Sequence, residues 1–329
     1  MRIWLFAVGA FVLIPALAEA KECVYSEKSF LARVVAFDSQ KRHTYGGEKG
    51  GAGEATSEPP LLGEKEIVLS FEQGPHSAYT KYILDILDKH CVKATFFLKG
   101  SAVLANSVAV RDVARRGHTL AAGVWSKANA AKPEDARNEL ESALAAVAKA
   151  SKEPVAPFLR MSQRALAPEF QAYIEERGVS LWYADIESGD GDQGLTPTAF
   201  ANRTLARLKE AGKGVLALRD TSKMTVDALD SILINMEIEG FKIVQIVPTA
   251  NFEPKAEVSE KLSLPAAVAP PRVARPAADQ RVEQQRRDAP RPLARETPRV
   301  AAPAAQPQRR LSERENAARQ TGSGVDSRQ

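Results

Sequence analysis

The chain has 329 residues, of which 44% are hydrophobic and 26% are charged, and its net charge is +4. After the N-terminal run no segment is apolar enough to span a bilayer, which excludes a multispan membrane protein. The charge is unevenly distributed: residues 255–329 carry fifteen Lys and Arg against nine Asp and Glu, whereas residues 21–254 carry a net charge of −2. The folded part is therefore expected to be mildly acidic, and the basic character belongs to the C-terminal region.

The first twenty residues have the pattern of a secretory signal peptide. Met1 and Arg2 give a positive start, an apolar run follows from Ile3 to Leu17, and Ala18-Glu19-Ala20 offers a small-x-small cleavage site. An uncleaved anchor is the alternative, but the run is shorter than a membrane span and contains Pro15. We expect a periplasmic or secreted protein with no membrane span after cleavage and no nucleic-acid partner.

The chain contains two cysteines, Cys23 and Cys91. In an oxidising compartment two cysteines in a chain of this size predict a single disulfide between them. Two free thiols are the alternative.

Composition divides the chain into four parts. After the signal peptide, residues 21–63 are rich in Gly and Pro and are predicted to be an extended lead-in. Residues 64–250 carry nearly all the periodic apolar pattern and are predicted to form the folded domain. Residues 251–329 consist largely of Ala, Pro, Arg and Gln and are predicted to be disordered, either as a solvated linker or with loose attraction to anionic envelope polymers.

The folded part alternates short apolar runs with helical patterns, which predicts an α/β fold with a parallel sheet and crossover helices. Seven strands are expected, at 66–71, 93–98, 118–125, 157–161, 180–186, 214–219 and 242–247. One helix is expected to begin at Thr196 and Pro197, and another near Thr225, ending at Gly240. The pattern alone fits either a closed barrel or an open, doubly wound sheet.

Several motifs resemble the polysaccharide deacetylase family, the NodB-like group of carbohydrate esterases. The segment EIVLSFEQGPHSAYTKYILDILDKHCVKATFFLKG at 66–100 is similar to the family's opening strand, helix and second strand. The similarity continues in one collinear order through GHTLAAGVWSK, PFLR, WYADIESGD and GKGVLALRD to residue 246. It implies a distorted (β/α) barrel of about seven strands, with the site at the C-terminal ends of the strands.

In this family a divalent metal such as zinc activates water, a carboxylate takes the water's proton and a histidine protonates the leaving amine. The family's T-F-D-D-G is here Ser70 to Gly74, so Glu72 stands at the base position and Gln73 at a metal-ligand position. The family's His-x-x-x-His pair is replaced by Gly123 and Lys127. No two of the four histidines lie four residues apart, so we expect no bound metal and no other cofactor.

The remaining motifs place four more residues at the expected site. Arg219, followed by Asp220, stands where the family has its general acid, and an arginine does not release a proton near neutral pH. Arg160 and Asp185 match an arginine and an aspartate of the family's site, and Asp185 is expected to pair with Arg219.

These replacements leave three interpretations of the cluster: an ion-pair network that stabilises the barrel mouth, a cleft that binds without hydrolysis, or residual catalysis. The favoured function is accordingly a non-catalytic exported protein that binds an amino-sugar glycan, another cell-envelope polymer or a protein partner. The alternatives are an active enzyme that removes N-acetyl groups from chitooligosaccharide or peptidoglycan, and a structural envelope protein.

Overall fold

The computed structural model describes residues 30–46, 60–123, 133–161 and 166–264. They lie within one structural unit that extends to Glu283, and the second unit, residues 284–329, falls outside the described ranges. The predicted signal peptide, Cys23 and Lys127 also fall outside them. The expectations for these residues therefore stay predictions.

Ten strands in the described part form one sheet in which every pairing is parallel. The order along the main path is β1-β10-β3-β4-β5-β6-β7-β2, and β9 joins β3 to β8. The strands are β1 (Leu31–Phe37), β2 (Thr44–Tyr45), β3 (Glu66–Glu72), β4 (Thr95–Lys99), β5 (Thr119–Gly123), β6 (Phe158–Arg160), β7 (Ser180–Trp182), β8 (Ile186–Glu187), β9 (Gly214–Arg219) and β10 (Lys242–Pro248).

The sheet curves into a distorted barrel. This curvature brings residues from strands that are not neighbours into contact inside it. The guanidinium of Arg160 on β6 donates to the hydroxyl of Ser70 on β3, 3.0 Å away. The hydroxyl of Thr119 on β5 donates to the carbonyl of Ile246 on β10 at 2.5 Å. The seven expected strands are all present, but the one expected at 180–186 is divided into β7 and β8.

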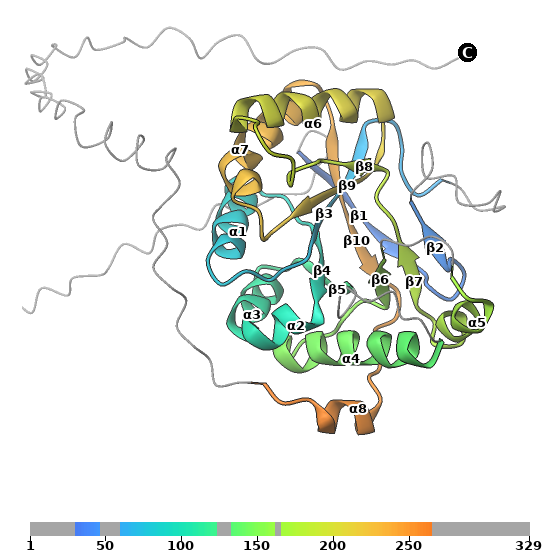
Figure 1. Cartoon of the computed structure of the whole chain (residues 1–329). Helices are drawn as coiled ribbons and strands as arrows, with labels where there is room; N and C mark the ends of the chain where they lie inside the picture. Colours follow the sequence, from blue (N-terminus) through green and yellow to red (C-terminus); the bar gives the residue numbers. More distant parts are fainter. Residues whose placement is uncertain (1–29, 47–59, 124–132, 162–165, 265–329) are drawn as a thin grey trace, which may run out of the picture. The chain divides into compact units, whose positions relative to one another are not determined.

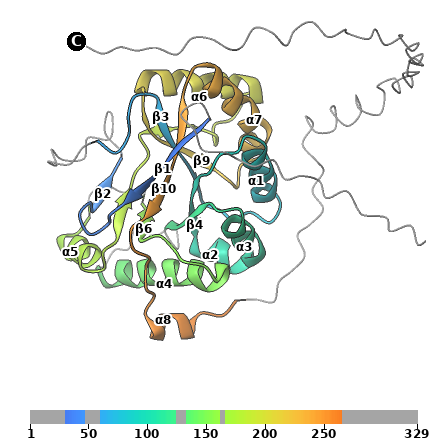
Figure 2. The same ribbon diagram turned by 180° about the vertical axis from the view of Figure 1, so that it is seen from behind.

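Helices cover the outside of the sheet (Figures 1 and 2). They are α1 (Tyr79–Lys89), α2 (Gly100–Ala105), α3 (Ser107–Arg115), α4 (Pro133–Ser151), α5 (Pro168–Glu176), α6 (Pro197–Ala211), α7 (Lys223–Ile238) and α8 (Ala256–Lys261). The Thr196 side chain caps α6 by accepting from the amide of Ala199, as expected from the sequence. Ser222 caps α7, so this helix begins two residues before the expected Thr225.

Alternate residues along the strands divide the core into two clusters. On β3, Ile67, Leu69 and Phe71 pack in the cluster beneath the helices, whereas Val68 belongs to the cluster inside the barrel. The inner cluster is rich in aromatic rings, and Trp182 is fully buried with its ring centroid 4.8 Å from that of Phe37. This alternation sends Ser70 and Glu72, which share a face with Val68, toward the barrel interior.

The expected extended lead-in at 21–63 is wrong for the residues that the structure describes. β1 pairs with β10 from Leu31 to Phe37, and β2 pairs with β7. Phe37 and Tyr45 are buried in the inner cluster. The segment has too little apolar surface for a core of its own, but it completes the core of the main domain.

The predicted start of the disordered tail at 251 is also wrong. The amide of Phe252 donates to the carbonyl of Val155 at 2.9 Å, and the Phe252 side chain is buried in the outer cluster. The ammonium group of Lys149 on α4 donates to carbonyls at the end of α8, those of Ser259 and Leu262. Residues 251–264 therefore belong to the folded domain, and the prediction for 265–329 falls outside the described residues.

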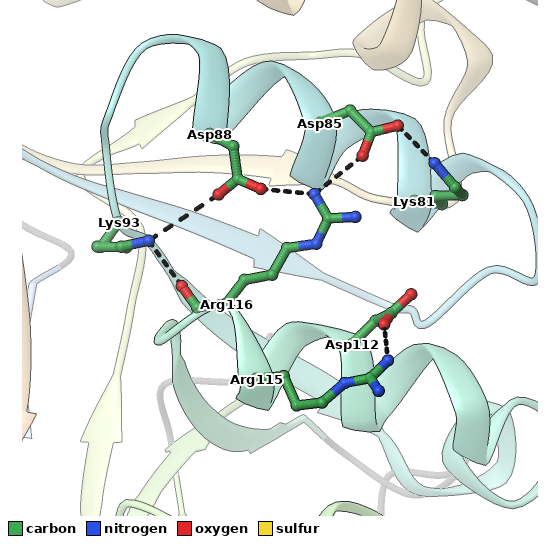
Figure 3. Close-up of polar contacts among 7 residues, drawn as sticks. All are labelled: Lys81, Asp85, Asp88, Lys93, Asp112, Arg115 and Arg116. Atoms are coloured by element: carbon green, nitrogen blue, oxygen red, sulfur yellow. Dashed lines mark hydrogen bonds and ion pairs between the residues drawn. The ribbon is translucent and has the colours of Figure 1, made fainter. Parts of the chain in front are cut away.

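A charged network joins α1 to the end of α3 (Figure 3). Arg116 lies 2.9 Å from Asp85 and 2.6 Å from Asp88. The ammonium group of Lys93 lies 3.9 Å from Asp88 and donates to the carbonyl of Arg116 at 2.6 Å. These contacts fix α1 and α3 to the loop that enters β4.

Among the helices of the described ranges, none has the combined length and apolar character that crossing a membrane requires.

Candidate functional site

The mouth of the barrel is formed by the C-terminal ends of its strands. Glu72 ends β3 and pairs in register with Arg219 at the end of β9. Lys99 ends β4 and pairs with Gly123, which in turn pairs with Arg160 at the end of β6. Parallel pairing thus gathers the polar strand ends that the motifs singled out at one edge.

A pocket of about 240 Å³ opens at this edge. Its polar and apolar lining is mixed, and the residues are Glu72, Gln73, Phe97, Lys99, Gly123, Arg160, Met161, Tyr183, Ala184 and Glu187.

Arg160 forms the floor of the pocket. Its side chain is only 7% exposed and lies over the ring of Phe97, 4.6 Å from the centroid. One terminal nitrogen bonds Ser70, and the other lies 3.9 Å from a carboxylate oxygen of Glu72. Burial lowers the pKa of Arg160, and the opposing effect of Glu72 keeps this buried cation paired with a charge.

Glu72 stands above Arg160 with 21% of its side chain exposed. Burial raises its pKa most strongly; Arg160 opposes that rise, and Glu187 adds to it. The structure therefore brings the expected base position and Arg160 together, as the sequence predicted, and adds Glu187 as a nearby charge.

Arg219, at the acid position, is held by the loop that follows β8. Its amide donates to Oδ2 of Asp190 at 2.6 Å, and its Nε lies 3.5 Å from Oδ1 of the same carboxylate. The hydroxyl of Thr225 donates to Oδ2 as well, at 2.6 Å. A Cβ atom on Gly191 would lie 2.2 Å from Nη1 of Arg219, so a larger residue there would displace the guanidinium from this loop.

Asp185 is placed at the opposite end of β9, which corrects its expected pairing with Arg219. Its Oδ2 accepts from the amide of Val215 at 2.8 Å, and its own amide donates to the Val215 carbonyl. Val215 and Arg219 are four residues apart on one strand, about 13 Å along it. Asp185 thus anchors the start of β9, while Asp190 has the role expected of Asp185.

Asp220 lies behind the mouth and is fully buried. Its Oδ2 accepts from the hydroxyl of Thr80 at 2.8 Å, which connects β9 to the start of α1. Burial raises the pKa of this carboxyl to about 7. Asp220 supports the loop that carries Gln73 and Gly74.

Two of the described histidines make structural contacts. Nδ1 of His76 accepts from the amides of Ala78 and Tyr79 at the start of α1. Nδ1 of His118 accepts from the amide of Ala94, and burial lowers the pKa of this histidine to about 3.

The sequence did not single out several of the lining residues, among them Phe97, Lys99, Tyr183 and Glu187. Two of them could have been found from the sequence, because Phe97 and Lys99 occupy alternate positions of β4 and therefore lie on its inner face. Glu187 is not found in this way, because it depends on the break that starts β8 within the expected strand.

The comparisons with known proteins agree with the fold. Residues 62–181 match the family model of polysaccharide deacetylases. A peptidoglycan deacetylase of Bdellovibrio bacteriovorus has a similar structure, with a TM-score of 0.59 and 23% identity over 70% of this chain and 63% of that one. A carbohydrate esterase 4 pseudoenzyme of Bacillus anthracis gives a TM-score of 0.51 and 18% identity, over 56% of this chain and 64% of that one.

Curated relatives are similar over parts of their length. A peptidoglycan-N-acetylglucosamine deacetylase of Listeria monocytogenes is 26% identical over 190 residues, 57% of this chain and 39% of that protein. A chitooligosaccharide deacetylase of Rhizobium leguminosarum bv. trifolii is 43% identical over 58 residues, 18% of this chain and 27% of that protein. The chain therefore spans about two fifths of the Listeria relative and about a quarter of the Rhizobium one.

The family match corrects the expectation of no cofactor, because deacetylases of this family use a divalent metal. The described residues at the ligand positions do not fit that ion, since Gln73 offers a neutral amide and Gly123 offers no side chain. A Cβ atom at Gly123 would lie 3.1 Å from the Phe97 carbonyl oxygen, so β5 has little room for a larger residue. Within the described ranges, no three His, Cys, Asp or Glu residues are grouped as metal ligands.

Proposed function

Because the chain belongs to the polysaccharide deacetylase family, we propose that its pocket binds an amino-sugar glycan of the cell envelope without deacetylating it. The single observation that carries the proposal is the attachment of Arg219 to Asp190 at the position of the general acid. We further propose, from the N-terminal pattern, that the protein is exported to the periplasm or secreted.

Binding is supported by the lining of the pocket. Carboxylate, amide and ammonium groups from Glu72, Gln73 and Lys99 offer partners for the hydroxyl and amide groups of a sugar. The rings of Phe97 and Tyr183 and the side chain of Met161 add apolar surface. Such a mixture of apolar surface with a few polar groups is typical of a small-ligand site.

The absence of hydrolysis follows from the acid position. Cleaving an amide requires a proton on the leaving nitrogen, and the guanidinium of Arg219 keeps its protons at neutral pH.

An active deacetylase is the alternative, and it is favoured by the relatives whose names are peptidoglycan-N-acetylglucosamine deacetylase and chitooligosaccharide deacetylase. A structural envelope protein is the second alternative, in which the contact between Arg160 and Glu72 serves only the barrel.

The test combines sedimentation with insoluble peptidoglycan or chitin and a measurement of released acetate, with and without added divalent metal. We expect the protein to sediment with at least one polymer and to release no acetate above a heat-denatured control. Glu187→Gln in the pocket should weaken sedimentation, whereas Glu210→Gln on the exposed face of α6 should not. Acetate release that a chelator abolishes would establish the deacetylase. If the protein neither binds a polymer nor releases acetate, the structural role is the one that remains.

A further inference from the structure

The carboxylate of Glu72 lines the pocket without a hydrogen-bond donor from the described part of the protein. Its ion pair with Arg160 spans 3.9 Å, which is longer than a hydrogen bond. The guanidinium group of Arg160 donates its hydrogen bond to Ser70 and lies over the face of the Phe97 ring. A carboxylate with only 21% of its side chain exposed is stabilised strongly by a donor, so the pocket is prepared for a ligand that supplies one.

The charges of the pocket are separated by strand. Glu187 on β8 and Glu72 on β3 lie on either side of β9, and each pairs in register with a residue of that strand. The cation of β9, Arg219, is paired with Asp190. Lys99 lies on β4, on the other side of β3 from β9. The β8–β9–β3 side of the mouth therefore presents two carboxylates above the buried Arg160, and the ammonium group of Lys99 belongs to the side beyond it.

We propose that the pocket recognises the free amine of a de-N-acetylated amino sugar, with its ammonium group between Glu72 and Glu187. This inference rests on the proposed function and names its ligand class. An ammonium group brings three donors and a positive charge, and its bonds to carboxylates are charge-assisted. An N-acetylated sugar brings one neutral N–H group and an acetyl group that requires additional room.

The inference is tested by titrating the full mature protein with two oligosaccharides of equal length, a glucosamine oligomer and an N-acetylglucosamine oligomer, by calorimetry. We expect the glucosamine oligomer to bind roughly tenfold or more tightly, the range of one charge-assisted hydrogen bond. The isosteric Glu72→Gln and the more exposed Glu187→Gln should each remove most of that preference. Glu210→Gln is the matched control for general attraction between an acidic domain and a cationic oligomer.

The outcomes separate the two proposals. Equal or tighter binding of the N-acetylated oligomer, weakened by Glu187→Gln, would overturn the amine preference and leave glycan binding in place. If Glu210→Gln reduces the preference for glucosamine as much as Glu187→Gln does, the preference comes from general surface attraction. That result would also overturn the proposed amine recognition. Binding of neither oligomer would contradict the proposed function itself.

Discussion

The carboxylate of Asp220 occupies the space that a Cβ atom on Gly74 would need. That atom would lie 1.9 Å from both carboxylate oxygens. We predict that Gly74→Ala lowers the free energy of unfolding by about 3 kcal/mol or more, because Asp220 must leave its bond with Thr80. Gly63→Ala is the control, since its Cβ atom would meet Glu66 at an ordinary 3.5 Å. Equal denaturant midpoints for the two variants would contradict the prediction.

The buried carboxyl of Asp220 also predicts a pH dependence of stability. Its pKa is about 7 in the folded protein against an ordinary value of 3.8, so between these values the folded state holds more protons than the unfolded state. The free energy of unfolding should therefore fall as the pH rises from about 4 to 7 and level off above. Urea denaturation should show this fall weakened in Asp220→Asn and retained in Asp112→Asn on the surface. Identical profiles for the three proteins would refute this assignment.

Two truncations test the role of residues 251–264. A chain ending at Pro254 loses α8 and the carbonyls that Lys149 binds, together with the packing of Leu262 and Leu264 against the core. We expect its melting temperature to drop by several degrees. A chain ending at Leu264 keeps these contacts and should melt close to the full chain. Equal melting of both truncated chains would show that the segment adds no stability.

Buried Glu141 on α4 forms an ion pair with the partly buried Arg177 at the end of α5. Glu141 is 4% exposed, lies 2.5 Å from Arg177 and accepts from the hydroxyl of Tyr173 at 2.7 Å. Arg177→Ala would leave the Glu141 carboxylate buried without this partner and should lower the free energy of unfolding by about 3 kcal/mol. Lys81→Ala, which breaks the exposed pair with Asp85 in Figure 3, should cost less than about 1 kcal/mol. Equivalent losses in chemical denaturation would be incompatible with this difference.

The predicted disulfide between Cys23 and Cys91 remains to be tested, because Cys23 lies outside the described residues. Mass analysis of the exported protein after denaturation without a reductant should show no thiol that reacts with an alkylating reagent. After reduction, both cysteines should react. Two labelled thiols before reduction would exclude the bond.

The sequence predicted the strands that carry the motifs, because their apolar runs are flanked by clear turn signals. It missed β1, although LARVVAF is a good strand pattern, because the neighbouring Gly- and Pro-rich stretch suggested a lead-in. What makes β1 part of the domain is its pairing with β10, more than 200 residues away, and local propensity does not encode that partner.

The sequence predicted several residues that lie at the candidate site, but it predicted fewer of the contacts between them. Strand ends at one edge of a parallel sheet had to meet, which placed Glu72, Arg160 and Arg219 correctly. The partner of Arg219 depends on the conformation of the loop at 187–192, which two arginines of α6 hold by its carbonyls. A short break between β7 and β8 then decides whether Asp185 or Asp190 reaches the mouth, and no motif signals that break.

The branching of the sheet at β3 has a consequence for local opening. β3 pairs with β9 along most of its length, with β10 at its start and with β4 at its end, from Ser70 to Glu72. Its amides are therefore released only when several strands separate together, and hydrogen exchange there should follow global unfolding. We therefore expect the amide of Glu72, at the end of β3, to stay protected until the domain unfolds, whereas the amide of Glu187 on the two-residue β8 should exchange through a small local fluctuation.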